Sequence, residues 1–225
     1  MTIHEPMTAF TDLVVALWTW CITYRIARVA SCWAQRAWAF SIAMVGVSAL
    51  TGGLYHALSS AHPLAAPLWS VAMIAAGLSS GSLVVGSARG ALPRRWARVA
   101  TVVVAAEVVV YLIRLPGHAP IEYAVAQYGR AMLALVCLES YAWLALGSRA
   151  APWFLAGFLA ALVAAGAQKS GLAPHPGFNQ NDLAHLIQLV VMGLFFLGAA
   201  RLRERDEDSS ATEARSEPGG VQRDR

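Results

Sequence analysis

Seven long apolar runs restrict what this chain can fold into more than any other feature of its sequence. They lie at residues 8–27, 37–60, 64–87, 97–115, 120–147, 151–168 and 182–200. About 20 apolar residues are enough for one helix to cross the hydrocarbon core of a bilayer. With 57% hydrophobic and only 13% charged residues, the chain has too little polar surface for a soluble domain of this size. We therefore predict an all-α integral membrane protein, a bundle of seven transmembrane helices.

Basic residues between these runs predict the orientation of the bundle. The loops after the first, third and fifth runs, together with the segment after the seventh, hold eleven Arg residues, whereas the opposite side holds only Arg114 and Lys169. Because cytoplasmic loops carry the excess of basic residues, we expect the N-terminus outside and the C-terminus in the cytoplasm. The same asymmetry explains the net charge of +4 without a nucleic-acid partner. Abundant Arg and Ala favour a bacterial cytoplasmic (inner) membrane.

The chain divides into a membrane domain, residues 1–200, and a charged segment, residues 201–225, which we predict to be a disordered cytoplasmic tail. No basic region precedes the first apolar run, so we expect that run to remain as a span and not to be a cleaved signal. The three cysteines lack a paired spacing, which predicts neither a disulfide nor a thiolate metal site. Gly77 and Gly81 form a GxxxG pair that predicts close helix packing.

All six histidines fall at or near the predicted outer end of the bundle. Four of them are expected to be ordinary loop residues: His4, His62, His118 and His175. His56 and His185 instead lie inside apolar helices, where ionisable side chains are costly and often face a functional interior. They either share a polar site or make plain hydrogen bonds between helices.

The last apolar run begins within the polar segment GFNQNDLAH, which ends at His185. Asn179 is expected to cap this helix, and Asp182 to return the bond as in a capping box. Three further polar residues recur at i, i+4 and i+7, a spacing that puts them on one face of the helix. We expect this stripe to face the interior of the bundle: Asn181, His185 and Gln188.

Two other helices contribute to the same end. Two glycines lie three and four residues before His56, and their missing side chains leave room for another helix or a ligand. Asp12 lies about one turn inside the first run. It either caps its helix together with Thr11 or turns inward toward His56 and His185.

Imidazole and carboxylate groups are typical ligands of zinc, and a catalytic zinc keeps three protein ligands and a water. His56 and His185 are the candidate metal ligands, and Asp12 or Asp182 is the candidate third ligand or catalytic base. Three alternatives stay open: a sensor or scaffold without a complete metal site, haem or quinone electron transfer, and transport. Deeper in the bundle, Arg130 is expected to pair with Glu107 or Glu139, because charges in lipid usually pair.

Seven spans, a histidine at the end of the second and a histidine-bearing polar start to the seventh resemble the superfamily of alkaline ceramidases, adiponectin/progestin-type receptors and Per1-like proteins. The GGLYH and FNQNDLAH stretches look like motifs of uncharacterised bacterial seven-span proteins near this group. The resemblance covers the span layout of residues 8–200. It implies zinc held by His56 and His185 and hydrolysis of a lipid amide or ester near the outer membrane face.

The sequence departs from that superfamily at two positions. Gly52 stands where the superfamily has a serine, and Asn181 stands where it has a second histidine four residues before His185. Only two metal ligands therefore carry over from the resemblance. A third must come from Asp12, from Asp182 or from elsewhere. Without it, the chain fits a non-enzymatic membrane sensor or scaffold.

Overall fold

The computed structural model describes residues 5–59, 61–115 and 120–205, and it contains the seven predicted helices. All seven are long and apolar enough to cross a membrane, and no strand occurs among the described residues. The protein is therefore a multi-pass, all-helical bundle. The helices are α1 (Pro6–Val29), α2 (Trp33–Ala57), α3 (Ala65–Ala91), α4 (Arg94–Arg114), α5 (Ile121–Leu146), α6 (Ala151–Lys169) and α7 (Gln180–Ala199).

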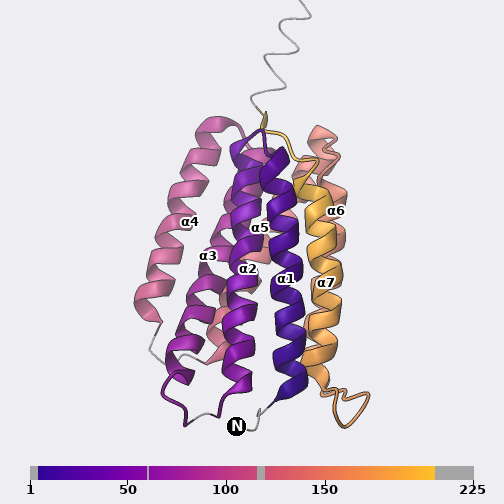
Figure 1. Cartoon of the computed structure of the whole chain (residues 1–225). Helices are drawn as coiled ribbons and strands as arrows, with labels where there is room; N and C mark the ends of the chain where they lie inside the picture. Colours follow the sequence, from indigo (N-terminus) through magenta and orange to yellow (C-terminus); the bar gives the residue numbers. More distant parts are fainter. Residues whose placement is uncertain (1–4, 60, 116–119, 206–225) are drawn as a thin grey trace, which may run out of the picture.

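Six of the helices form a ring, and α4 stands outside it (Figure 1). Around the ring the order is α1, α2, α3, α5, α6 and α7, and α7 closes the ring by packing against α1. The GxxxG pair of α3 explains the place of α4. A Cβ atom at Gly77 would overlap the ring of Tyr111, and one at Gly81 would lie 2.5 Å from Val108 Cγ2. The predicted packing role of this pair is confirmed.

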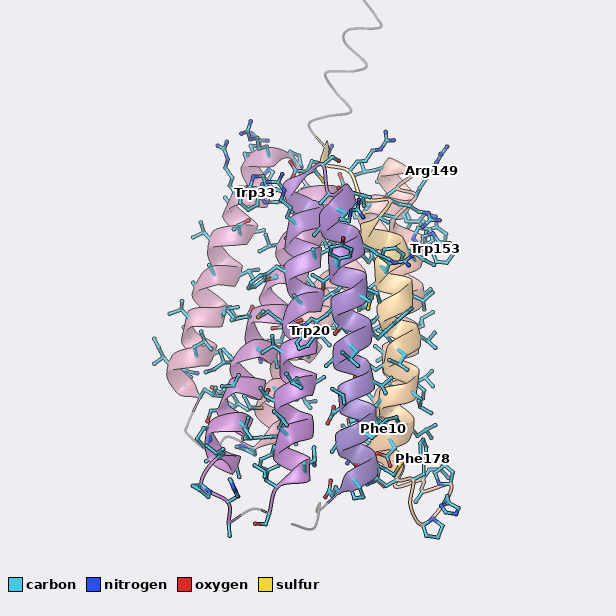
Figure 2. The ribbon with its side chains drawn as sticks, in the orientation of Figure 1. Phe10, Trp20, Trp33, Arg149, Trp153 and Phe178 are labelled. Atoms are coloured by element: carbon cyan, nitrogen blue, oxygen red, sulfur yellow. The ribbon has the colours of Figure 1, made fainter. Side chains whose placement is uncertain are left out.

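The two ends of the bundle differ in chemistry, and we name them by their residues. The arginine end comprises the starts of α2, α4 and α6, and the histidine end comprises the starts of α1, α3, α5 and α7. Figure 2 shows Trp33, Arg149 and Trp153 at the arginine end and Phe178 at the histidine end. At the arginine end, Arg89 lies over the Trp33 ring and Arg201 lies 5.1 Å from the centre of the Trp153 ring. Aromatic and basic side chains gathered at one level are typical of a membrane interface.

Three aromatic side chains fill the interior of the bundle near its arginine end. Trp38 of α2 stacks on Phe154 of α6 with ring centres 4.3 Å apart, and Phe195 of α7 lies 5.2 Å from Trp38. All three side chains are almost fully buried. This cluster joins three helices that are distant in sequence, and it forms the floor of the cavity described below.

The segment after α7 differs from the prediction. Residues 201–205, which we assigned to the disordered tail, pack against the arginine end. Leu202 is 4% exposed and lies against the backbone of Gly90, where a Cβ atom would meet its side chain. Glu204 accepts a hydrogen bond from the backbone N–H of Ala34 at 2.9 Å, at the start of α2. The packed part of the chain therefore continues to residue 205, and the rest of the predicted tail, residues 206–225, lies outside the described residues.

Candidate functional site

The entry of α7 carries the predicted capping box. The side chain of Asn179 accepts hydrogen bonds from the backbone N–H groups of Asn181 and Asp182. In return, Asp182 accepts the backbone N–H of Asn179 at 2.8 Å. The box fixes where the helix begins, and it also fixes the direction of the next turn, which carries His185.

Asp182 is fully buried and turned toward α1 rather than toward the centre of the bundle. Its Oδ1 accepts a hydrogen bond from the Thr11 hydroxyl at 3.4 Å. Asn179 likewise donates from its side chain to the Thr8 hydroxyl at 3.3 Å. Asp182 thus joins α7 to α1 and caps its own helix. Both of its carboxylate oxygens have partners outside the cavity, whereas Asp12 lines the cavity.

Asp12 and His185 form the centre of the site. Asp12 is the seventh residue of α1, too far inside the helix to cap it, so the capping alternative is wrong. Its Oδ1 lies 3.3 Å from Nε2 of His185. The other ring nitrogen of His185, Nδ1, lies 2.9 Å from the Thr11 hydroxyl. Both nitrogens are therefore engaged, and neighbouring residues of α1 hold the imidazole from two sides.

A glycine makes this contact between helices possible. A Cβ atom at Gly53 of α2 would lie 2.8 Å from Cβ of Asp12 and 3.2 Å from the carbonyl oxygen of Ala9. No side chain fits there without moving α1. The expectation that the glycines before His56 let another helix approach is confirmed, and α1 is the helix that occupies the space.

His56 sits near the last turn of α2 and has a partner that we did not expect. Its Nδ1 lies 2.8 Å from a carboxylate oxygen of Glu5, and the Glu5 backbone N–H donates to the carbonyl of His56 at 3.1 Å. The sequence carries no signal for this contact, because no spacing relates Glu5 to His56. With Nδ1 held by Glu5, the imidazole keeps Nε2 for another partner, an arrangement common around histidine ligands of metals.

These side chains surround one end of a cavity of about 890 Å³ inside the ring of helices. Its floor contains Trp38 and Phe195, and its walls are mostly apolar residues of α2, α3, α5 and α6. The expectation that the stripe of α7 faces the interior is confirmed, because all three of its members line the cavity. The polar lining near the histidine end includes Asp12, His56, Gln168, Asn181, His185 and Gln188.

The cavity also reaches the outer surface of the bundle between α5 and α6. Val125 and Leu133 of α5 and Leu162 of α6 line it and are 50%, 66% and 53% exposed. Gly129 lies among them, and a Cβ atom added there would meet nothing within 4 Å. The space is therefore a largely apolar pocket with a side opening between α5 and α6 and a polar end at His185.

The donor set meets part of what zinc requires. Two ligands of a tetrahedral zinc, each about 2 Å from the metal, lie about 3.3 Å from each other, which matches the distance between Asp12 and His185. No group of three or more His, Cys, Asp and Glu side chains among the described residues has the arrangement to hold a metal. The residues as they stand do not complete a zinc site, and zinc remains a prediction.

Two of the four predicted loop histidines lie among the described residues. His62 and His175 each accept a backbone N–H of their own loop, as ordinary loop residues do, while His4 and His118 lie outside the described residues. Arg130 pairs with Glu107, whose carboxylate accepts its Nε–H at 2.8 Å. Glu139 is buried with one carboxylate oxygen lacking a partner. Cys21, Cys32 and Cys137 form no disulfide in this structure.

Fold and site together define a class: a seven-helix membrane protein with a carboxylate–imidazole cluster at one end of an internal cavity. The chain belongs to a family of unknown function, DUF6962, whose pattern matches residues 7–204. That range covers almost all of the seven helices. No curated protein and no solved structure gives a significant match.

Proposed function

We propose that this protein binds a lipid-like molecule in the cavity and hydrolyses an amide or ester bond in it. The observation that carries the proposal is the composition of the cavity. Its volume of about 890 Å³ falls within the roughly 300–1,000 Å³ typical of small-molecule sites. An acyl chain fits the apolar walls, and the polar linkage of the lipid fits beside Asp12, His56 and His185. The side opening gives such a molecule a route from the bilayer.

The hydrogen bonds of His185 supply the chemistry. The single hydroxyl proton of Thr11 has three acceptors: Nδ1 of His185, the carbonyl of Thr8 and Asp182. When Thr11 donates to Nδ1, Nε2 carries the ring proton and donates it to the Asp12 carboxylate. When the pair has taken up one further proton, from the attacking water, Thr11 donates elsewhere, Nδ1 carries the ring proton, and the protonated Asp12 donates to the lone pair of Nε2. The pair thus binds and releases protons without a large movement.

This pair supports general acid–base hydrolysis. Asp12 and His185 accept a proton from a water molecule as its oxygen bonds to the carbonyl carbon. They return that proton to the leaving nitrogen or oxygen as the amide or ester bond breaks. A zinc ion at the site would supply a bound water of lower pKa and polarise the carbonyl; no step above depends on it.

One observation favours a second candidate, a sensor or scaffold that binds the molecule without cleaving it. Asn181, which stands where the resembling superfamily has a histidine, bonds to the Gln168 side chain at 3.3 Å. This contact joins α6 to α7 across the polar end of the cavity. If this contact forms only when a ligand fills the cavity, α6 and α7 change position on binding, and that movement signals that the ligand is bound.

Lipid binding and turnover are tested separately. The full chain is purified in lipid nanodiscs, and bound lipids are extracted and identified by mass spectrometry. The same preparation is then given an N-acyl lipid amide and a matched ester, and release of fatty acid is measured. We expect a retained lipid, and a rate that falls by about 10²-fold or more in Asp12→Asn or His185→Gln, the usual contribution of acid–base groups.

His62→Gln is the matched control, because it changes a histidine at the same end that lies in a loop. It is expected to leave binding and turnover unchanged. A retained lipid without turnover would favour the sensor. If the preparation retains no lipid and shows no turnover, the proposal is contradicted. Metal content of the same preparation tests zinc: one zinc per chain that is lost in His56→Ala supports it, and less than a tenth of one zinc per chain contradicts it.

A further inference from the structure

An ion pair lies within the membrane-spanning part of the bundle, outside the cavity. Arg130 of α5 donates to Glu107 of α4 at 2.8 Å and also to the side chain of Gln127. By the helix rise of 1.5 Å per residue, Arg130 lies about 14 Å from the first residue of α5 and Glu107 about 10 Å from the last residue of α4. The pair is therefore too deep for water at the histidine end to solvate it directly.

The pair is nonetheless only partly covered by the chain itself. The side chains of Arg130 and Glu107 are 57% and 40% exposed. Lipid hydrocarbon offers these groups no hydrogen bonds, so charges at this depth normally face protein or water. Arg130 uses two of its five N–H donors in the bonds above. Another polar group is needed against this surface.

The residues around the pair on α4 and α5 are exposed. The helix α4 packs against α3 and stands outside the ring, so most of its surface faces away from the bundle. Val103 and Val110, one turn to either side of Glu107, are 61% and 47% exposed. On α5, Cys137 is exposed and lies two turns from Arg130 on the same side of the helix. We call Val103, Glu107, Val110, Arg130 and Cys137 the α4–α5 face.

We infer that the α4–α5 face binds a second copy of this chain, forming a homodimer around the Glu107–Arg130 pairs. A two-fold axis brings the same surface of both copies together, so a residue that contacts a second residue is contacted by it in return. A patch with one acid and one base is complementary to itself under that axis. Glu107 of each copy then meets Arg130 of the other. The two partly exposed ion pairs of the separate copies become one group of four alternating charges.

Charge reversal across two differently tagged copies tests this directly. Wild-type copies with different tags, expressed in the same membrane, are expected to co-purify in nanodiscs. Copies that all carry Glu107→Arg, or all carry Arg130→Glu, place like charges against each other, and co-purification should fall about tenfold or more. A Glu107→Arg copy mixed with an Arg130→Glu copy should recover it.

The mixed experiment separates the dimer from the pair within one chain. Neither variant regains an ion pair inside its own chain, so recovery on mixing comes only from contact between copies. Absence of co-purification in the wild type would overturn the inference, and so would a mixed sample no better than the two like-charged samples. Co-purification of some other protein without a second copy would overturn it as well.

A second measurement uses the native chain, in case the reversed variants fail to fold. A flexible bis-maleimide cross-linker added to membranes should join two copies through the exposed Cys137 residues near the interface, producing a band of twice the mass. Cys137→Ser should abolish the band, whereas Cys21→Ser, which changes the exposed cysteine of α1, should not. Absence of the band, or its persistence in Cys137→Ser, contradicts a dimer through this face.

Discussion

Among single residues, Thr11 makes the most polar contacts at the site. Its hydroxyl lies within hydrogen-bonding distance of His185, Asp182 and the carbonyl of Thr8. Thr11→Val keeps the shape of the side chain and removes the hydroxyl. It leaves buried polar groups without a partner, which costs about 1–3 kcal/mol. We therefore expect a lower free energy of unfolding, measured by denaturant titration in detergent. Thr11→Ser keeps the hydroxyl and should lose clearly less; equal losses would show that the methyl group, not the hydrogen bond, matters.

The positions of the polar site residues could be predicted from the sequence where spacing along a single helix determines them. The stripe of α7 and the cap at Asn179 follow from spacing along one helix, and both were predicted. Asp12 left two alternatives, because the sequence does not say where α1 begins; the start at Pro6 places Asp12 in the second turn. The Glu5–His56 contact joins two segments that no spacing relates, and it was missed.

At the scale of the helices, Gly53 sets the distance between α1 and α2. Gly53→Ala would push a methyl group against Asp12 and the backbone of Ala9, and overpacking of this kind costs about 1–3 kcal/mol. Moving α1 also separates Asp12 from His185. We expect both a lower thermal unfolding midpoint and weaker retention of the bound lipid.

The control for Gly53→Ala is Gly166→Ala in α6. A Cβ atom at Gly166 meets nothing within 4 Å, and alanine is the better helix former by about 1 kcal/mol. This variant should be as stable as the wild type or slightly more so. Comparable losses in the two variants would mean that glycine flexibility, not the close approach of α1, explains the effect at Gly53.

Helix number and the packing role of the GxxxG pair were both predictable, whereas the place of α4 was not. Each apolar run predicts one helix independently of the others, because length and composition decide whether a segment can cross a membrane. Which helix leaves the ring depends on pairwise surfaces. Gly77 and Gly81 indicate a close neighbour for α3, but many helices could supply it. Only the fit of Tyr111 and Val108 against those glycines shows that α4 does.

For the whole molecule, the cavity is the feature that the sequence predicts least. Six helices contribute to its walls, and its volume is the space that their side chains fail to fill. No single helix carries a signal for it, and the small residues of α3 and α6 fit a packed interior equally well. The sequence indicated a polar end through His56, His185 and Asp12. The apolar space beside that end, which makes a lipid-like ligand the best proposal, appears only in the assembled bundle.

The direction of the bundle in the membrane decides which leaflet supplies that ligand. The excess of Arg at the arginine end predicts that this end is cytoplasmic. A green fluorescent protein fused after Arg205 should therefore fluoresce in a bacterial host, and alkaline phosphatase fused in the loop between α6 and α7 should be active. Phosphatase fused after α5 should be inactive. The reverse pattern would place the cavity end with His56 and His185 at the cytoplasmic face. The lipid would then come from the inner leaflet, and the proposed site on the outer side would be wrong.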